Sequence, residues 1–303
     1  MKVHSLKKLF MALAVLWMGS PSLQARPVAE QPMDGAVLQR QDLPYRFETL
    51  DIDSVDGQRH YRVWVASPKR SAPKEGFSVV YMLDGNAALG SLAPDLLQQL
   101  DQGAAPVLVV IGYATNNRID RASRTLDYTP STGSGEQRDP LTGQPNGGAD
   151  AFLDLLQTRI KPAVAQKVAL NTRRQTLWGH SYGGLLVLHA LLTRPRDFQN
   201  YAAASPSLWW NDGWINQELD GFGARLGTHK ANLLLMRGDK EPAAPPPIQL
   251  TEQPADRAAR TFLASLQSVS HLSHQYKVFP GLSHGPMLDA SLRYTLQWVN
   301  RQP

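Results

Sequence analysis

Short apolar runs alternate with longer segments of helical periodicity over most of the chain. Strand-like runs occupy residues 77–83, 107–111, 176–178 and 233–236, with a more alternating run at 276–279. Helical patterns lie between or after several of them, at 151–168, 185–193, 255–269 and 287–299. Buried strands that alternate with helices predict an α/β fold with a mostly parallel central sheet and helices on both faces.

Three stretches depart from this alternation. From Tyr45 the pattern alternates between apolar and polar residues, and Asp56-Gly57 lies before a second strand-like stretch at 61–65, which predicts an opening β-hairpin. Residues 115–149 are polar and rich in Gly, Arg and Asp, and residues 242–254 are rich in Pro. Long loops of this kind are functional or poorly ordered. Neither is flanked by enough sequence to form a second domain, so we predict one domain over residues 26–303.

The N-terminus has the pattern of a secretory signal peptide. Lys2, Lys7 and Lys8 precede an apolar run at 9–17, and small residues follow it up to Ala25. The run is short for a bilayer span, so residues 1–25 are predicted to be a cleaved signal, with an uncleaved membrane anchor as the alternative. The chain has no Cys, which excludes disulfides, thiolate catalysis and lipid attachment at cysteine. These features predict a periplasmic protein.

Charge gives little support to nucleic-acid binding. The net charge is +5, but three of the positive charges are the lysines of the signal segment. The rest of the chain has no run of Lys or Arg, so we expect no nucleic-acid partner. With 42% hydrophobic and 19% charged residues, the chain can form a sizeable core.

The sequence Gly179-His180-Ser181-Tyr182-Gly183 carries the strongest chemical signal. It follows a strand-like stretch at 175–178 and precedes a helical run that stops before Pro195. Strand, G-x-S-x-G and helix together form the nucleophile elbow of α/β-hydrolases, in which a strained turn lifts the serine hydroxyl off the sheet. Glycines flank the serine because side chains there would collide with neighbouring backbone. We therefore predict Ser181 as the nucleophile; an ordinary helix start is the alternative.

A serine nucleophile needs a base, and chain order selects His284. In this fold the order is Ser, then Asp or Glu, then His. His284 lies in a Gly- and Pro-containing loop after the last predicted strand and before the last predicted helix. His271 and His274 have metal-like spacing, but nothing nearby supplies a third ligand. No metal and no cofactor is expected.

Two acidic residues follow the predicted strand at 233–236. A carboxylate at this position can fix the imidazole tautomer and stabilise the imidazolium. Asp239 is the first choice and Glu241 the second, although both flank Lys240 and could be ordinary surface charges. The sequence thus predicts a Ser–His pair and leaves the third member open.

The remaining predicted site residues stabilise the oxyanion or line the pocket. The amide of Tyr182 is one expected oxyanion donor, and Asn86 or Gly85, after the strand at 77–83, supplies the second. The segment 118–130 concentrates cations beside aromatic residues. Together with Trp209 and Trp210, it predicts a pocket for an anionic, aromatic ligand.

Several motifs together resemble the periplasmic trilactone-siderophore esterases, within a broader esterase family that includes enterobactin esterase and esterase D. The matching stretches are Tyr81 to Asn86, Arg124 to Pro130, Trp178 to Gly184, Ala204 to Leu208 and Phe279 to Met287. The resemblance implies an α/β-hydrolase that hydrolyses a catecholate trilactone such as enterobactin or salmochelin, iron-loaded or apo. It implies Ser181 and His284 as the catalytic pair and Arg124 as a cation that contacts the ligand.

The sequence also departs from this family. The relatives it most resembles work as a Ser–His dyad, whereas Asp239 and Glu241 allow a triad here. The Gly-rich stretch 132–148 is longer than the family's usual connection, so pocket shape is open. Two other functions remain in view, a general carboxylesterase or acyltransferase with the same site, and a non-catalytic siderophore-binding protein.

Overall fold

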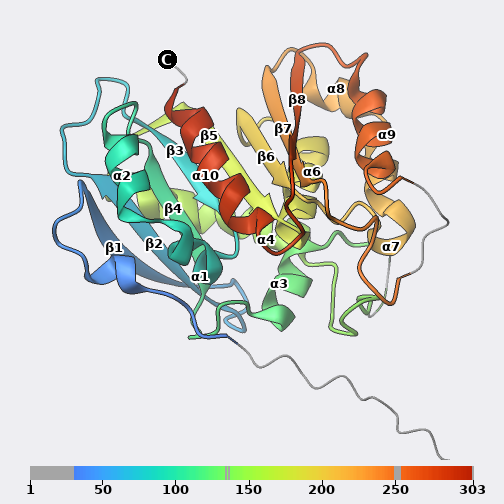
Figure 1. Cartoon of the computed structure of the whole chain (residues 1–303), viewed down its shortest axis with the longest axis horizontal. Coiled ribbons are helices and arrows are strands. Elements are labelled where there is room, and N and C mark those ends of the chain that lie inside the picture. Colours follow the sequence, from blue (N-terminus) through green and yellow to red (C-terminus); the bar gives the residue numbers. More distant parts are fainter. Residues whose placement is uncertain (1–30, 134, 136, 249–253, 302–303) are drawn as a thin grey trace, which may run out of the picture.

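The computed structural model describes residues 31–133, 135, 137–248 and 254–301, and the statements below concern these residues. The predicted signal segment lies outside them. Figure 1 shows a central sheet crossed by helix α10, with the remaining helices arranged around it. No helix among the described residues is long and apolar enough to cross a membrane.

Eight strands form the sheet, in the order β1-β2-β4-β3-β5-β6-β7-β8. They are β1 (Tyr45–Asp53), β2 (His60–Pro68), β3 (Phe77–Met82), β4 (Val107–Tyr113), β5 (Leu170–His180), β6 (Asn200–Ala204), β7 (Ala231–Gly238) and β8 (Leu272–Phe279). β2 pairs antiparallel with both β1 and β4, whereas every pairing from β4 to β8 is parallel. This topology confirms the predicted hairpin and the mostly parallel sheet of an α/β-hydrolase.

The connections between strands carry the helices. They are α1 (Gly85–Ala88), α2 (Pro94–Asp101), α3 (Arg121–Tyr128), α4 (Ala149–Leu155), α5 (Lys161–Ala165), α6 (Tyr182–Thr193), α7 (Trp210–Gly213), α8 (Phe222–Leu226), α9 (Arg257–Leu266) and α10 (Met287–Asn300). Shorter helical turns are η1 (Ala36–Gln39), η2 (Leu89–Ser91), η3 (Leu156–Ile160) and η4 (Trp214–Leu219).

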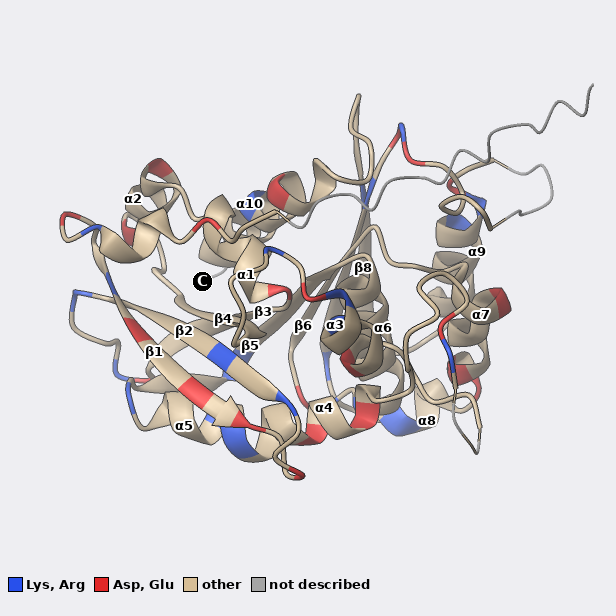
Figure 2. Cartoon of the chain, turned by 90° about the horizontal axis from the view of Figure 1, so that it is seen from below, with Lys and Arg blue, Asp and Glu red and all other residues tan. Residues whose placement is uncertain are grey.

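Each face of the sheet has its own hydrophobic core. Side chains alternate along a strand, so Val79 and Tyr81 of β3 pack with α6, while Val80 and Met82 pack with α10. Figure 2 shows α1, α2 and α10 on one side of the sheet and α4, α5 and α8 on the other. Strands β3 and β4 are buried along their whole length, which explains why the sequence shows them as continuous apolar runs.

Two elements differ from the sequence-based expectation. β6 is absent from the predicted strands because Asn200–Ala204 contains three alanines and no β-branched residue, and it becomes a strand through its neighbours β5 and β7. Helix α3 lies within the stretch predicted as a long loop. Asp120 caps it, since its carboxylate accepts the N–H of Ser123 at 2.9 Å.

Candidate active site

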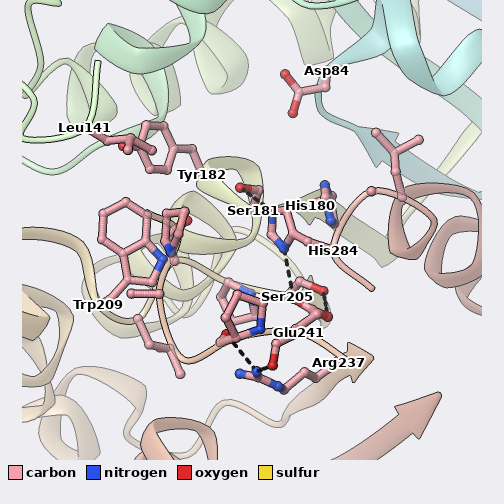
Figure 3. Close-up of a pocket in the computed structure, with 18 of the residues that line it drawn as sticks. Asp84, Leu141, His180, Ser181, Tyr182, Ser205, Trp209, Arg237, Glu241 and His284 are labelled. Carbon is pink, nitrogen blue, oxygen red and sulfur yellow. Dashed lines mark hydrogen bonds and ion pairs between the residues drawn. The ribbon is translucent and has the colours of Figure 1, made fainter. Parts of the chain in front are cut away.

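Four polar side chains lie at the carboxyl ends of the parallel strands. Ser181 follows β5, Ser205 follows β6, Glu241 comes shortly after β7, and His284 lies in the loop after β8. Ligands of open α/β sheets bind at this edge. Figure 3 shows Ser181 and His284 side by side, with Glu241 and Ser205 beyond the imidazole.

Ser181 has the strained backbone of a nucleophile elbow. Its φ of 61° and ψ of −117° lie outside the regions that non-glycine residues favour. Two glycines make the turn possible. A Cβ on Gly179 would lie 2.4 Å from the Gly183 backbone, and one on Gly184 would lie 2.7 Å from the Ala204 carbonyl oxygen. The strand and the helix therefore approach each other at glycine positions, which lifts Ser181 to the sheet edge.

A continuous hydrogen-bond relay runs from Ser181 to Glu241. His284 Nε2 lies 3.0 Å from Ser181 Oγ, and His284 Nδ1 lies 2.8 Å from Glu241 Oε2. The other carboxylate oxygen, Oε1, accepts the N–H of Gly238 at 2.6 Å and the hydroxyl of Ser205 at 2.7 Å. This is the geometry of a nucleophile, a base and an orienting acid.

The environment keeps Glu241 ionised. Burial of the side chain raises the pKa of its carboxyl, but hydrogen bonds from His284, Gly238 and Ser205 outweigh burial and lower the pKa below its usual value of 4.5. Arg237 Nη2 donates to the carbonyls of Glu241 and Pro242, at 2.6 and 2.9 Å, and so fixes the turn that carries the acid.

Asp239, the first choice for the acid from the sequence, does not hold His284 in the structure. Asp239 Oδ1 accepts the N–H of Gly281 at 2.7 Å, whereas Glu241, the second choice, holds the histidine. The Asp239 amide donates to the Phe279 carbonyl and continues the β7–β8 contact. Asp239 therefore fastens the loop after β8, and the orienting position belongs to Glu241.

His180 packs against the catalytic imidazole. The rings of His180 and His284 have centroids 4.5 Å apart. Burial, with the electrostatic influence of the adjacent His284 and Arg124, lowers the pKa of His180 well below its ordinary value of 6.5. His180 is therefore a neutral support beside His284 and adds no competing charge.

The two predicted oxyanion donors lie on different elements. Tyr182 is the first residue of α6, where backbone N–H groups have no partner within the helix. Asn86 is buried in α1, and its side chain is fixed to the end of β4. Asn86 Oδ1 accepts the Tyr113 N–H at 2.8 Å, and Nδ2 donates to the Thr115 carbonyl at 2.8 Å. This holds the Asn86 backbone in place; the oxyanion role of its amide stays a prediction.

The cationic segment predicted at 118–130 borders the cavity, but its arginines differ in whether a carboxylate pairs with them. Arg124 binds Asp84 through two hydrogen bonds, at 2.7 and 2.9 Å, and its guanidinium carbon lies 5.4 Å from the ring centroid of Tyr182. Asp84 therefore neutralises Arg124, whose predicted contact with ligand stays a prediction. Arg118 and Arg121 also line the cavity, and no hydrogen bond or ion pair joins either guanidinium group to another residue that the structure describes.

The cavity in front of Ser181 has a volume of about 440 Å³. Trp209 lines it, as do Tyr182 and Leu141, and the Tyr182 and Trp209 rings are 6.0 Å apart. Trp210 is buried behind this wall. Sequence reasoning missed three polar residues of the site: Asp84, which binds Arg124; Ser205, which donates to Glu241; and Asp139, which accepts from Tyr182 and Trp210. Nothing in the local pattern distinguishes them from other polar loop residues.

The described residues contain no group of three or more His, Asp or Glu side chains arranged to hold a metal ion. Ser181 instead has a base within hydrogen-bond distance, a charged group behind that base, and a helix N-terminus beside it. These parts generate and stabilise an attacking alkoxide. The fold and the site define a serine hydrolase of the α/β-hydrolase type.

The comparisons with known proteins agree with this class. A model of the Putative esterase family matches residues 54–284. The chain is 36% identical over 275 residues to the apo-salmochelin esterase of Escherichia coli O6:H1 (strain CFT073), covering 88% of this chain and 83% of that protein. It is 32% identical over 204 residues to the ferri-bacillibactin esterase BesA of Bacillus subtilis (strain 168), covering 64% of this chain and 70% of the relative.

A solved structure of the enterobactin and salmochelin hydrolase IroE superposes with a TM-score of 0.72 at 36% identity. The match covers 88% of this chain and 100% of the other. The chain therefore belongs to this esterase family, and it is a carboxylic ester hydrolase that acts on a small molecule.

Proposed function

We propose that this chain hydrolyses the ester bonds of a catecholate trilactone siderophore such as enterobactin. The observation that carries the proposal is the Ser181–His284–Glu241 relay, which opens into a cavity with aromatic and cationic side chains. The relatives named for salmochelin, bacillibactin and enterobactin support the substrate class.

Acylation begins with proton transfer from Ser181 Oγ to His284 Nε2. Oγ attacks the ester carbonyl carbon, and the negative charge moves to the carbonyl oxygen, which the amides of Tyr182 and Asn86 hold. The tetrahedral intermediate collapses, the bond to the ester oxygen breaks, and His284 gives its proton to the departing alkoxide. Ionised Glu241 stabilises the imidazolium throughout, because it accepts from Nδ1.

Deacylation repeats these steps with water. His284 Nε2 takes a proton from a water molecule, and the hydroxide attacks the acyl group on Ser181. The second intermediate collapses with return of the proton to Ser181 Oγ, which releases a carboxylic acid and restores the enzyme. No cofactor takes part in these steps.

The cavity matches the chemistry of a catecholate ligand. Catecholate rings are aromatic and carry negative charge when deprotonated or bound to iron. Trp209 offers an aromatic face, and the guanidinium groups of Arg118 and Arg121 are available to pair with anionic oxygens. Two cations that line the cavity favour the more highly charged form of the substrate, so the iron-loaded siderophore is the proposed preference.

Product analysis tests the proposal. Ferric and apo enterobactin are incubated with wild type and with Ser181→Ala, and the linear products are measured by mass spectrometry. We expect ring opening by the wild type alone, faster with the ferric form. Equal ring opening by both proteins would contradict the role of Ser181 as nucleophile. Faster turnover of the apo form would contradict the proposed preference for the iron-loaded siderophore.

Two comparisons separate this function from its alternatives. A clear preference for p-nitrophenyl esters over trilactones would favour a general carboxylesterase or acyltransferase. A fluorophosphonate probe should label Ser181, because the relay activates the hydroxyl. Failure to label, with retained binding of the siderophore, would indicate a non-catalytic binding protein.

We also propose that the chain is exported to the periplasm. The support is the sequence pattern of residues 1–25, which predicts a signal that is removed to leave a domain of residues 26–303. Expression of the full chain in a Gram-negative host, followed by fractionation and N-terminal sequencing, tests it. A full-length chain in the membrane fraction would instead indicate an uncleaved anchor that holds the enzyme near the membrane.

A further inference from the structure

Asp139 is a buried carboxylate in the loop between α3 and α4. Asp139 is only 2% exposed, although the loop around it is polar and Gly-rich. Such burial is rare for Asp without a cation. No Lys, Arg or His side chain among the described residues forms an ion pair with Asp139. Its neighbours are neutral hydrogen-bond donors from three parts of the chain.

The first set of donors belongs to the loop itself. Asp139 Oδ1 accepts the backbone N–H groups of Leu141 and Thr142, at 3.1 and 2.7 Å, and the Thr142 hydroxyl at 2.8 Å. These bonds fold residues 139–142 into a tight turn. The turn places Leu141 and Thr142 at the cavity.

The second set belongs to the wall of the active site. The Tyr182 hydroxyl lies 3.0 and 2.9 Å from Oδ1 and Oδ2, and Trp210 Nε1 donates to Oδ2 at 2.8 Å. Burial and the adjacent Asp139 carboxylate raise the pKa of Tyr182, so its hydroxyl stays protonated and donates. One carboxylate thus joins the loop to the residue after the nucleophile and to the residue after Trp209.

The residues that Asp139 joins form one continuous surface. Leu141, Tyr182 and Trp209 lie next to one another at the cavity (Figure 3). The Tyr182 ring also contacts the Arg124 guanidinium, which Asp84 holds from the other side. Tyr182 is therefore fixed at its hydroxyl by Asp139, at its ring by Arg124, and at its backbone by α6.

We propose that Asp139 is a positioning residue that sets the selectivity of the enzyme for large aromatic substrates. It does so by holding the wall of Leu141, Tyr182 and Trp209 at a fixed distance from Ser181. The proposal deepens the proposed function and rests on it for the identity of the large substrate. It concerns substrate binding, since Asp139 contacts neither His284 nor Ser181.

Asp139→Asn is the sharpest substitution. It preserves volume, but an amide offers one acceptor oxygen where the carboxylate has two, and Trp210 Nε1 and the loop amides can only donate. The variant must therefore lose its hydrogen bond either to Trp210 or to the loop amides. Tyr182→Phe is the second variant: it keeps the ring and the backbone amide and removes only the hydroxyl. Asp220→Asn, at an exposed aspartate, is the matched control.

The test compares substrates of different size on the same proteins. KM and kcat are measured for enterobactin, for p-nitrophenyl benzoate and for p-nitrophenyl acetate. In Asp139→Asn we expect KM for the two large substrates to rise about tenfold or more, and kcat/KM for the acetate ester to fall less than about threefold. The quantity compared between variants is the ratio of kcat/KM for a large ester to kcat/KM for the acetate ester. Tyr182→Phe should lower this ratio by a smaller factor than Asp139→Asn does, and Asp220→Asn should leave it unchanged.

Two results would overturn the proposal: an equal loss on large and small esters, or no change in either. If Asp139→Asn does not fold, as judged by circular dichroism and Tm, the ratio in Tyr182→Phe decides. The benzoate arm keeps this test separate from the proposed function. A wild type that hydrolyses benzoate but not enterobactin would refute the siderophore assignment, and the acetate-to-benzoate ratio would still judge Asp139.

Discussion

Glu241 and Asp139 are both buried carboxylates beside the cavity, and they differ in what surrounds them. Glu241, after β7, accepts from the titratable His284, so its charge acts on the movement of a proton. Asp139, in the loop between α3 and α4, accepts from amides, a phenol and an indole, none of which changes charge near neutral pH. Both are paired with dipoles from several elements, which is how a buried carboxylate is tolerated.

The difference assigns separate tasks to the two sides of the site. The β7–β8 side holds the base and the acid and so determines the rate of bond cleavage. The α3–α4 side holds the wall that faces the substrate and so determines which esters reach Ser181. Substitutions on the first side should therefore lower kcat for every ester, whereas those on the second should depend on substrate size.

The largest effect should come from the nucleophile itself. Ser181→Ala removes the attacking oxygen, and we expect kcat for any ester to fall by about 10⁴ to 10⁶. Spectrophotometric assays with p-nitrophenyl acetate measure it, with heat-inactivated enzyme as the background control. Activity above about 1% of wild type would show that another residue is the nucleophile. It would also contradict the assignment of separate tasks to the two sides of the site.

The next effect separates the two candidate acids. Glu241→Gln keeps an acceptor near His284 Nδ1 but removes the charge that stabilises the imidazolium, so kcat should fall by about 10² to 10⁴. Asp239→Asn is the matched control, because the Asp239 carboxylate accepts from Gly281 in the loop after β8, so that kcat of this variant should change less than about threefold. Steady-state kinetics on one small ester decides, and the reverse order of effects would return the acid to Asp239.

Loss of the Arg124–Asp84 ion pair beside Tyr182 should lower the free energy of unfolding more than it lowers the activity. Arg124→Met leaves the Asp84 carboxylate buried and unpaired, because both side chains are nearly enclosed, and we expect a loss of about 3–5 kcal/mol in the free energy of unfolding. Denaturant unfolding measures it. The double variant with Asp84→Asn should recover part of the loss. A single variant as stable as wild type would show that the pair is not needed to hold Tyr182.

A smaller effect concerns pH. Burial raises the pKa of Glu241, but hydrogen bonds from His284, Gly238 and Ser205 lower it below 4.5, its value when unfolded. A lowered pKa stabilises the folded state above the unfolded pKa, and this contribution is lost as pH falls through the folded pKa. Denaturant unfolding of wild type and Glu241→Gln from about pH 7 down to about pH 3 measures it. The stability gap between the two proteins should narrow toward acid; a constant gap would contradict the assignment.

Part of this site could be predicted because its determinants are local or depend on chain order. The elbow lies within Gly179 to Gly184, where the strand, the turn and the helix are consecutive in sequence. His284 follows from the order of the fold and from its loop after the last strand. The α/β-hydrolase sheet follows in the same way from apolar runs that are buried on both faces.

The choice of acid could not be predicted because it depends on the contact between β7 and β8. Asp239 and Glu241 are two residues apart and have the same chemistry. The Asp239 amide bonds to Phe279, and the Lys240 amide bonds to Leu282, which turns Asp239 toward Gly281 and Glu241 toward His284. That orientation comes from residues some forty positions later in the chain.

The sequence alone predicted the nucleophile, its base and most of the strands, because each of these has a local pattern or a fixed place in the chain. Only the tertiary structure decided that Glu241 is the acid beside His284, that Asp84 holds Arg124, and that Asp139 joins the loop between α3 and α4 to Tyr182 and Trp210. A buried carboxylate looks like any polar loop residue until its donors are in place, and those donors come from segments far apart in sequence.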